Sequence, residues 1–214
     1  MSFWEYLDDR HQQLLADACR HAGVVLPCVA VATVLGVLVG VVSYRGGRAG
    51  DLATAASTVT AVPALAAIGL LVPVAGYGTP VAVIALTLYG LPPIARNAVM
   101  GLRGVDPALV DAARGIGMSR SARLLRVELP LAWPPILTGV RAATRTLTGV
   151  AALAACVSGP GLGEEILRGL AAPDRPDALD QVLAGTLGIV ALGLLFEAGL
   201  VLVGRLTVAR GIRG

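Results

Sequence analysis

The sequence of 214 residues contains no lysine, and all 17 of its basic side chains are arginine. A nucleotide-hydrolysing P-loop needs a lysine beside the phosphates, and enzymes that form Schiff bases need a lysine amine. Neither kind of site can be built from this chain. Any ATP-driven function would therefore require a second polypeptide that binds and hydrolyses the nucleotide.

Charged and aromatic residues are also scarce. Charged residues make up 14% of the chain and aromatic residues 4%, whereas 56% of the residues are apolar and the mean hydropathy is +0.77. A soluble domain averages about 25% charged residues, so this composition indicates an integral membrane protein. The length suits one membrane domain of about five or six spans of about 20 residues each. It leaves no room for a separate soluble catalytic domain.

Side chains that could perform catalysis or hold a metal ion are few and scattered. The three cysteines show neither metal-ligand nor disulfide spacing, and no Ser-His-Asp set is recognisable. His11 and His21 lie in a polar N-terminal segment, and we expect both rings to be solvated. We expect the same of Glu164 and Glu165, in a polar loop. We therefore predict no catalytic residue, no metal site and no cofactor on this chain, and no nucleic-acid partner.

Long uncharged runs predict an all-α membrane domain over residues 22–208 with five spans, at about residues 23–43, 52–72, 80–100, 133–157 and 182–203. Pro63 lies inside the second of these spans and Pro92 inside the third. Proline removes a backbone donor, so we expect both helices to kink or unwind there. Residues 209–214 follow as a short cytoplasmic tail.

Residues 1–21 are amphipathic rather than continuously apolar. Phe3, Trp4 and Leu7 begin a series of apolar residues at helical spacing, with charged residues between them. Aromatic anchors on one face of a charged helix are typical of a helix that lies at the membrane surface. We therefore predict an interfacial helix that precedes the first span.

The distribution of arginine predicts the orientation of the chain. The segments at residues 44–51, 96–129 and 204–214 carry eleven arginines and four acids, whereas the segments on the opposite side carry four arginines and nine acids. Loops rich in arginine face the cytoplasm. We therefore expect the interfacial helix and the N-terminus outside and the C-terminus in the cytoplasm.

A polar insert over residues 106–130 interrupts the apolar spans, and we call it the elbow. Asp106 is a natural N-cap, and Pro107 is tolerated in the first helical turn. Gly115 and Gly117 should end this first short helix. The expected result is a compact pair of short helices rather than another span.

The second short helix of the elbow has its own start and stop signals. Ser119 can cap its first turn, and the helix should continue through Arg126. Pro130 is expected to end the insert. The residue pattern then returns to a long apolar run.

The elbow resembles the EAA loop of the permease subunits of ABC importers, which reads Glu-Ala-Ala, three residues, Gly, nine residues, Ile-x-Leu-Pro. The spacing fits in full, with aspartate in place of glutamate and valine in place of isoleucine. In that family the loop is a cytoplasmic coupling helix that docks on the ATPase subunit, where ATP and Mg²⁺ bind. A glycine there lets the two short helices approach closely. The resemblance implies an ATPase-coupling role for Asp111, Ala112, Ala113, Gly115, Gly117, Val127, Leu129 and Pro130.

Four further segments resemble the osmoprotectant branch of these permeases, which imports glycine betaine, carnitine and choline. They cover residues 58–65, 88–97, 101–109 and 159–163. The resemblance implies a type I importer in the plasma membrane that works by alternating access. Its partners would be two ATPase subunits, a second permease that is an identical copy or a paralogue, and an external substrate-binding protein. Its external mouth would include Gly159, Gly161 and Gly163.

Three charged residues lie inside the predicted spans. Arg141 and Arg145 share one face of the fourth span, and Glu197 lies on the fifth at a similar depth. Unpaired charges at such depth cost several kcal/mol. We predict an Arg141–Glu197 ion pair, with Arg145 facing a polar cavity. The alternative is that both arginines extend toward the cytoplasm.

The residues that could line a substrate path are Pro63, Tyr89, Pro92 and Arg145. Quaternary ammonium groups are usually held in aromatic cages, and this chain has few aromatic residues. We therefore expect selectivity to belong mainly to the binding protein. Three alternatives remain open at this point: a permease for methionine or another small solute, an ATP-independent carrier or channel, and a membrane scaffold that transports nothing.

Overall fold

A computed structural model of the chain describes residues 3–46, 55, 58–59 and 61–207. All regular secondary structure within these residues is helical, as the sequence predicts. The elements in chain order are α1 (Phe3–Ser43), α3 (Ala64–Ala75), α4 (Thr79–Arg103), α5 (Pro107–Gly115), α6 (Arg120–Arg123), the π-helical turn η1 (Leu124–Glu128), α7 (Leu129–Leu153), the 3-10 turn η2 (Ala154–Val157), α8 (Gly163–Ala171) and α9 (Ala178–Thr207).

Helix α1 unites two predicted elements. It runs for 41 residues without interruption and contains both the amphipathic segment over residues 1–21, from Phe3 onward, and the first predicted span. The helix continues across Gly23 at the boundary and across Pro27 within the first span, since propagation of an existing helix is favourable once it has formed. The helix therefore does not end at residue 21. That its N-terminal part lies at a membrane surface remains a prediction.

Four stretches within the described residues are long and apolar enough to cross a membrane: Phe3–Ser43, Thr79–Arg103, Arg120–Val157 and Ala178–Thr207. They contain the first, third, fourth and fifth predicted spans. The second predicted span, over residues 52–72, lies partly outside the described residues. Its described part consists of residues 55, 58–59 and 61–63 and most of α3, a 12-residue helix that begins directly after Pro63. The third span does not unwind at Pro92, because α4 remains helical across it, and a kink there stays a prediction.

The core forms where α1, α4 and α7 pack together. Ile94, Ile136 and Leu147 are fully buried there. The helices approach closely at small residues: a Cβ placed on Gly40 of α1 would lie 2.5 Å from the Cβ of Ala98 in α4. Small residues that allow close contact are typical of helix packing in membranes. This packing fixes the positions of α1, α4 and α7 relative to one another.

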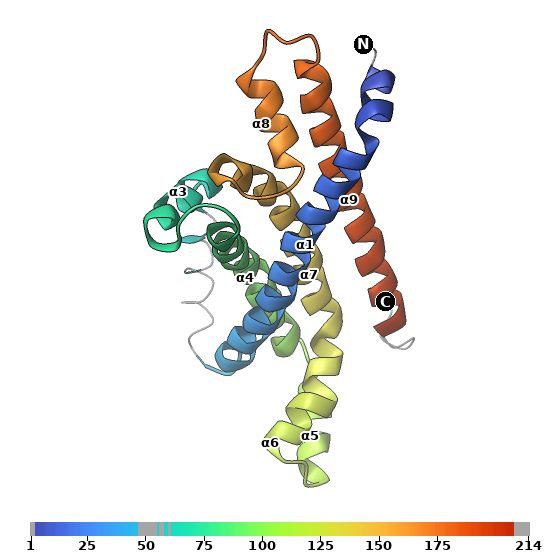
Figure 1. The fold of residues 1–214 in the computed structure, drawn as a ribbon. Coiled ribbons are helices and arrows are strands. Elements are labelled where there is room, and N and C mark those ends of the chain that lie inside the picture. Colours follow the sequence, from blue (N-terminus) through green and yellow to red (C-terminus); the bar gives the residue numbers. More distant parts are fainter. Residues whose placement is uncertain (1–2, 47–54, 56–57, 60, 208–214) are drawn as a thin grey trace.

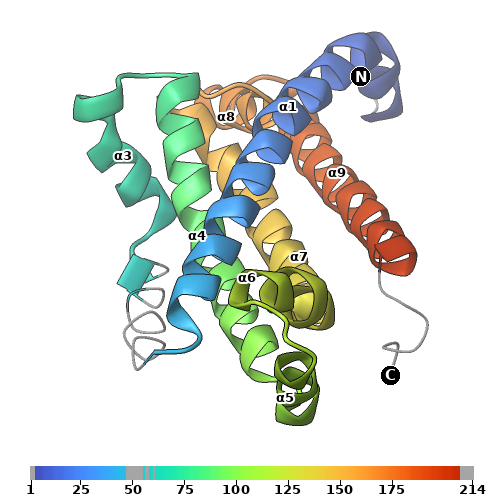
Figure 2. The same cartoon turned by 90° about the horizontal axis from the view of Figure 1, so that it is seen from below.

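The remaining helices surround this centre. In both views α3 lies on one side of α4 and α9 lies on the other side of the molecule (Figures 1 and 2). The elbow helices α5 and α6 project from one end, and α8 lies at the opposite end with the N-terminus (Figure 1). Large apolar side chains such as Leu194 and Leu195 of α9 are exposed, as expected for a surface that faces lipid or another membrane subunit.

Candidate coupling site and buried charge clusters

The first half of the elbow has the predicted start. The Asp106 side chain accepts a hydrogen bond from the backbone N–H of Ala108 at 2.8 Å, and Pro107 occupies the first helical position. This cap satisfies one of the donors that every helix N-terminus leaves free. Helix α5 therefore begins where the sequence predicts.

Helix α5 ends at Gly115, followed by Gly117 in a left-handed conformation with φ of +80°. The N–H of Gly117 donates to the carbonyl of Arg114 at 2.9 Å, and the N–H of Met118 donates to that of Ala113 at 3.1 Å. This pair of bonds is a Schellman motif, which requires a residue that tolerates positive φ. A Cβ added at Gly115 or Gly117 would meet nothing within 4 Å. The close-approach role expected for the glycine is therefore wrong, and Gly117 serves the backbone turn.

The second half of the elbow does not end as predicted. The Ser119 hydroxyl accepts from the N–H of Ala122 and starts α6, but the helix continues through η1 directly into α7. Pro130 lies in the first turn of α7 and does not end the insert. The π-helical turn immediately precedes this proline, which lacks the N–H that a regular α-helix would use there. The second half of the elbow is thus continuous with the helix of the fourth span, whereas α5 is separated from it by the turn at Gly117.

Several elbow side chains remain exposed on its outer surface. Asp111, Ala112 and Ile116 are exposed, and Asp111 makes only a surface ion pair with Arg114 at 2.9 Å. Ala113 is buried against the elbow itself. Among the later motif residues, Val127 and Leu129 are half-buried and Pro130 is exposed. The motif therefore presents a small acidic and apolar surface beyond the ends of the spans.

A buried carboxylate lies where the elbow joins α7. Glu128 is 2% exposed and Arg123 is 4% exposed. Glu128 Oε1 accepts from Arg123 Nε at 2.9 Å and from Arg45 Nη2 at 2.7 Å, while its Oε2 accepts from the Tyr44 hydroxyl at 2.5 Å. We call Tyr44, Arg45, Arg123 and Glu128 the Glu128 cluster. It connects the end of α1 to the elbow.

Helix α4 joins the same cluster through its last residue. Arg103 Nε donates to the carbonyl of Tyr44 at 3.0 Å, and its Nη2 donates to the carbonyl of Gly46 at 3.2 Å. Burial, reinforced by the adjacent Glu128 carboxylate, raises the pKa of Tyr44 to about 12. The Tyr44 hydroxyl therefore remains protonated and continues to donate throughout the physiological range.

The sequence indicated none of these contacts. Glu128 stands at the variable position between Val127 and Leu129 of the motif, where the sequence pattern marks it only as one of the acids in an arginine-rich segment. Its partner Arg123 precedes it by five residues, a spacing that meets across a π-turn but not across an ideal α-helix. Tyr44 and Arg45 are distant in sequence, so only the packing of α1 reveals the cluster.

A second buried carboxylate lies at the opposite end of the molecule, and it corrects an expectation. Glu165 is fully buried in α8 rather than solvated in a loop. It accepts from Tyr6 at 3.2 Å, from Gln13 at 3.0 Å and from Arg168 at 2.6 Å. We call Tyr6, Gln13, Glu165 and Arg168 the Glu165 cluster. Glu164 is only half-buried and pairs with Arg168 at 2.6 Å.

The predicted exposure of the histidines is correct for one of them only. His11 is exposed. His21 is fully buried, and its Nε2 donates to the carbonyl of Thr148 in α7 at 3.1 Å. In a long helix such as α1, a polar residue becomes buried when it lies on the face that packs against another helix. The polarity of the sequence did not indicate which face of α1 packs in this way.

Of the three glycines predicted at an external mouth, Gly159 and Gly161 lie between η2 and α8 and Gly163 begins α8, and all three are buried. A Cβ on Gly163 would lie 2.3 Å from the carbonyl oxygen of Ala152, and one on Gly161 would lie 2.8 Å from the Cβ of His21. Gly159 packs equally closely against Ala154. These glycines allow the loop to pack tightly against α7 and α1.

The structure brings together the three charges predicted inside the spans. Arg141 of α7 donates through Nε to Glu197 Oε1 of α9 at 2.8 Å, and its Nη2 contacts the same oxygen. Arg145 Nε lies 3.5 Å from Glu197 Oε2, and its side chain is 61% exposed. Both arginines thus share one carboxylate. Arg145 takes part in the ion pair as well as presenting an exposed surface.

The predicted substrate-path residues fall into two places. Tyr89 of α4 is 7% exposed and donates through its hydroxyl to the carbonyl of Val62, directly before Pro63. Pro92 is buried and lines a cavity of about 190 Å³ together with Val39, Val59 and Leu88, among other apolar residues. Arg145 belongs instead to the α7–α9 ion pair.

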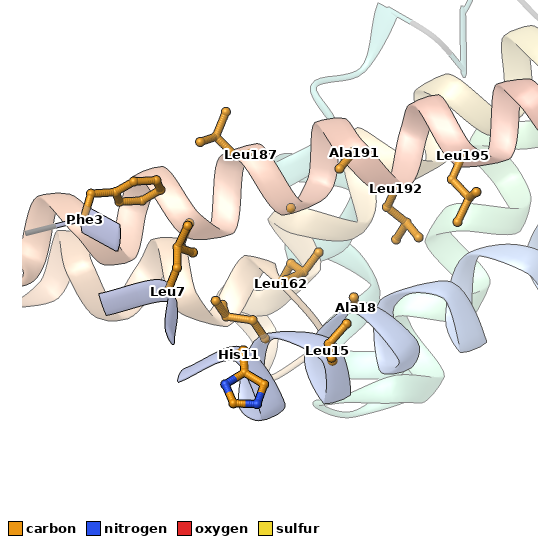
Figure 3. Close-up of a pocket in the computed structure, with 13 residues that line it drawn as sticks. Phe3, Leu7, His11, Leu15, Ala18, Leu162, Leu187, Ala191, Leu192 and Leu195 are labelled. Carbon is orange, nitrogen blue, oxygen red and sulfur yellow. The ribbon is translucent and has the colours of Figure 1, made fainter. Parts of the chain in front are cut away.

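A larger groove separates the N-terminal half of α1 from α9. It has a volume of about 560 Å³. Figure 3 shows side chains of α1 such as Phe3 and Leu7 along one side and leucines of α9 such as Leu187 and Leu192 along the other. Among the described residues that line it, His11 is the one polar side chain. The groove therefore offers mainly apolar contact.

Comparison with known proteins agrees with this geometry. The family of the binding-protein-dependent transport system inner membrane component matches residues 32–207. The choline transport system permease protein OpuBB of Bacillus subtilis (strain 168) is 35% identical over 167 residues, covering 78% of this chain and 77% of the relative. The osmoprotectant import permease protein OsmW of Salmonella typhimurium is 34% identical over 198 residues, covering 90% of each.

A third relative spans nearly the whole chain. The glycine betaine/carnitine/choline transport system permease protein OpuCB of Bacillus subtilis (strain 168) is 30% identical over 210 residues, covering 98% of this chain and 95% of the relative. An inward-facing structure of the MetNI methionine ABC transporter superposes with a TM-score of 0.80 at 18% identity, covering 98% of this chain and all of that chain. This chain therefore belongs to the inner membrane components of binding-protein-dependent transport systems, within the branch of the osmoprotectant permeases.

Proposed function

We propose that this chain is the membrane-spanning permease subunit of an ATP-driven importer for a quaternary-ammonium osmoprotectant such as glycine betaine, carnitine or choline. The observation that carries the proposal is the elbow, whose motif residues Asp111 and Ala112 are exposed on α5, the short helix that precedes the continuous stretch of α6, η1 and α7. Relatives that transport these solutes, at 30–35% identity, support the substrate class. The methionine transporter, at 18% identity, supports the fold alone.

The elbow is the docking surface for the ATPase in this proposal. Asp111 can pair with an arginine of the partner, and the small side chain of Ala112 leaves room for close contact. The chain contains no lysine for a P-loop, so ATP and Mg²⁺ belong to the ATPase subunit. ATP binding would move the elbow, and the spans would alternate between outward-open and inward-open arrangements.

The orientation follows from the arginine distribution. The elbow and the C-terminus lie in the cytoplasm, and the N-terminus and α8 lie outside. The external binding protein then approaches the end that contains Gly159, Gly161 and Gly163. A second permease, identical or paralogous, completes the path.

The substrate path passes the two places that the candidate residues occupy. Pro63, Tyr89 and Pro92 lie where α3 meets α4, and Arg145 exposes its guanidinium on α7. An exposed charge inside a span must face water or protein rather than lipid. Arg145 would therefore face the path or the second permease.

The test is uptake of radiolabelled glycine betaine, choline, carnitine and methionine into proteoliposomes that contain this chain with its ATPase and binding protein. We expect uptake of a quaternary-ammonium solute that requires ATP. Ala112→Trp should abolish uptake by blocking the docking surface. Val34→Trp, at a 61% exposed position on α1, is the matched control and should transport normally. ATP-independent uptake that Ala112→Trp leaves intact would favour a carrier instead, and uptake of methionine alone would reject the proposed substrate.

A further inference from the structure

The Glu128 cluster joins three parts of the chain that are distant in sequence: the end of α1, the end of α4 and the elbow. We propose that Glu128 is a positioning residue that transmits movement of the elbow to the ends of α1 and α4. The proposal rests on the proposed function, since an ATPase is what would move the elbow. It assigns the transmission step to residues outside the surface that docks on the ATPase.

Charge and burial make the cluster a strong connection. A buried carboxylate is costly unless it is paired and hydrogen-bonded. Both oxygens of Glu128 are satisfied, one by two arginines and the other by the Tyr44 hydroxyl. If α1 separated from the elbow, the buried Glu128 carboxylate would lose Tyr44 and Arg45 and would keep only Arg123 as a partner. The two elements are therefore expected to move together.

The position of Glu128 also favours transmission. It is the last residue of the π-helical turn that links the elbow to α7, and Arg123 lies on the same continuous helical stretch. The elbow packs on itself and on the start of α7, and Leu124 of η1 also packs against the buried core. Tyr44 and Arg45 add side-chain hydrogen bonds that link the elbow directly to the end of α1. π-Helical turns occur frequently at functional sites.

The Glu165 cluster offers a matched control within the same chain. Glu165 is equally buried and also accepts from three side chains, one of them an arginine and one a tyrosine. It lies at the opposite end from the elbow. A purely structural role should lower import and ATP hydrolysis in proportion in either variant, whereas transmission lowers the substrate imported per ATP in Glu128→Gln alone.

The first measurement is hydrogen exchange of the full chain in the assembled complex, in lipid nanodiscs. In Glu128→Gln we expect faster exchange both in the elbow and in the last turns of α1. Glu165→Gln should leave both regions unchanged. Faster exchange that stays within the elbow would overturn the proposal, and this measurement does not depend on the identity of the substrate.

The second measurement is the number of substrate molecules imported per ATP hydrolysed. Residues along a coupling network change coupling by a factor of roughly two to thirty. We expect Glu128→Gln to retain ATP hydrolysis while imported substrate per ATP falls within that range, and Glu165→Gln to keep the wild-type ratio. A proportional fall in both activities would indicate a structural role and would overturn the proposal.

A second variant removes the risk that Glu128→Gln does not assemble. The double variant Tyr44→Phe with Arg45→Gln removes the connection to α1 but keeps the Arg123–Glu128 pair intact. We expect it to reproduce the loss of coupling, and a wild-type ratio would overturn the proposal. If the wild-type complex itself imports nothing with ATP, the proposed function fails, and the exchange measurement still decides whether Glu128 joins the elbow to α1.

Discussion

The two ends of this molecule each contain a buried glutamate, but they hold it differently. Glu128 at the elbow end pairs with Arg123, whose side chain is also buried, and with residues at the end of α1. Glu165 at the opposite end pairs with Arg168, whose side chain is 42% exposed and has a second partner in Glu164. Glu128 thus has one buried arginine partner, Arg123, besides Arg45, whose side chain is 42% exposed, whereas the only arginine that pairs with Glu165 is the partly exposed Arg168. Within the described residues, a buried arginine partner is what distinguishes the elbow end from the α8 end.

Removing each glutamate should give the largest difference between the ends. Glu128→Ala leaves Arg123 buried without its charge partner, which costs about 3–5 kcal/mol. Glu165→Ala leaves Arg168 free to turn to water or to Glu164, so the loss is limited to hydrogen bonds and costs about 1–3 kcal/mol. Unfolding by denaturant in detergent micelles would measure both free energies. Equal losses would show that the two clusters do not differ in this way.

Replacing the glycines of positive φ with alanine should give the next largest difference in stability between the two ends of the molecule. Gly117 and Gly161 both have positive φ, but only Gly161 packs against another residue, His21. Gly117→Ala carries backbone strain alone, about 1–2 kcal/mol. Gly161→Ala adds overpacking of about 1–3 kcal/mol. The same denaturant unfolding measures both variants. Gly115→Ala is the control, because Gly115 has negative φ and open space around it. A larger loss of unfolding free energy in Gly117→Ala than in Gly161→Ala would contradict the close packing at Gly161.

Removing one tyrosine hydroxyl at each end should produce a smaller difference. The Tyr44 hydroxyl lies 2.5 Å from Glu128, and the Tyr6 hydroxyl lies 3.2 Å from Glu165. Hydrogen bonds to charged groups contribute about 1.5–3 kcal/mol. We expect Tyr44→Phe to lie near the upper value and Tyr6→Phe near or below the lower one, measured as a shift in the thermal midpoint of the purified complex. The reverse order would indicate that Glu165 is the more tightly held carboxylate.

Neutralising an exposed acid at each end should have the smallest effect on stability. Asp111 and Glu164 both form ion pairs with partly exposed arginines, and such pairs contribute about 0–1 kcal/mol. Asp111→Asn and Glu164→Gln should therefore unfold almost as the wild type does. Only Asp111→Asn should weaken binding of the ATPase, measured by co-purification at increasing salt. Equal co-purification of both variants would remove Asp111 from the docking surface.

Part of the coupling site could be predicted because its signals are local. Asp106 and Ser119 cap the helices that follow them, and Gly117 ends the first helix through backbone conformation alone. Each depends on residues within a few positions in sequence. The Arg141–Glu197 contact was also predictable, because apolar surroundings leave two opposite charges at similar depth few other partners.

Other features could not be predicted, because they depend on which helix faces meet. The sequence suggested that His21 and Glu165 are solvated, yet packing of α1 against α7 and α8 buries both. It suggested that Pro130 ends the elbow, yet a π-helical turn carries the helix past it. A polar residue in a polar segment shows no local sign of burial until the opposing helix is in place.

The sequence by itself determined the class of protein, the helical spans and the motif that presents Asp111 and Ala112, because composition, apolar run length and capping residues act locally. Only the tertiary structure decided that Tyr44, Arg45 and Arg123 converge around Glu128. The physical reason is that a carboxylate pairs with whichever donors the packed helices bring within about 3 Å. Close packing of small residues among α1, α4 and α7 sets that arrangement.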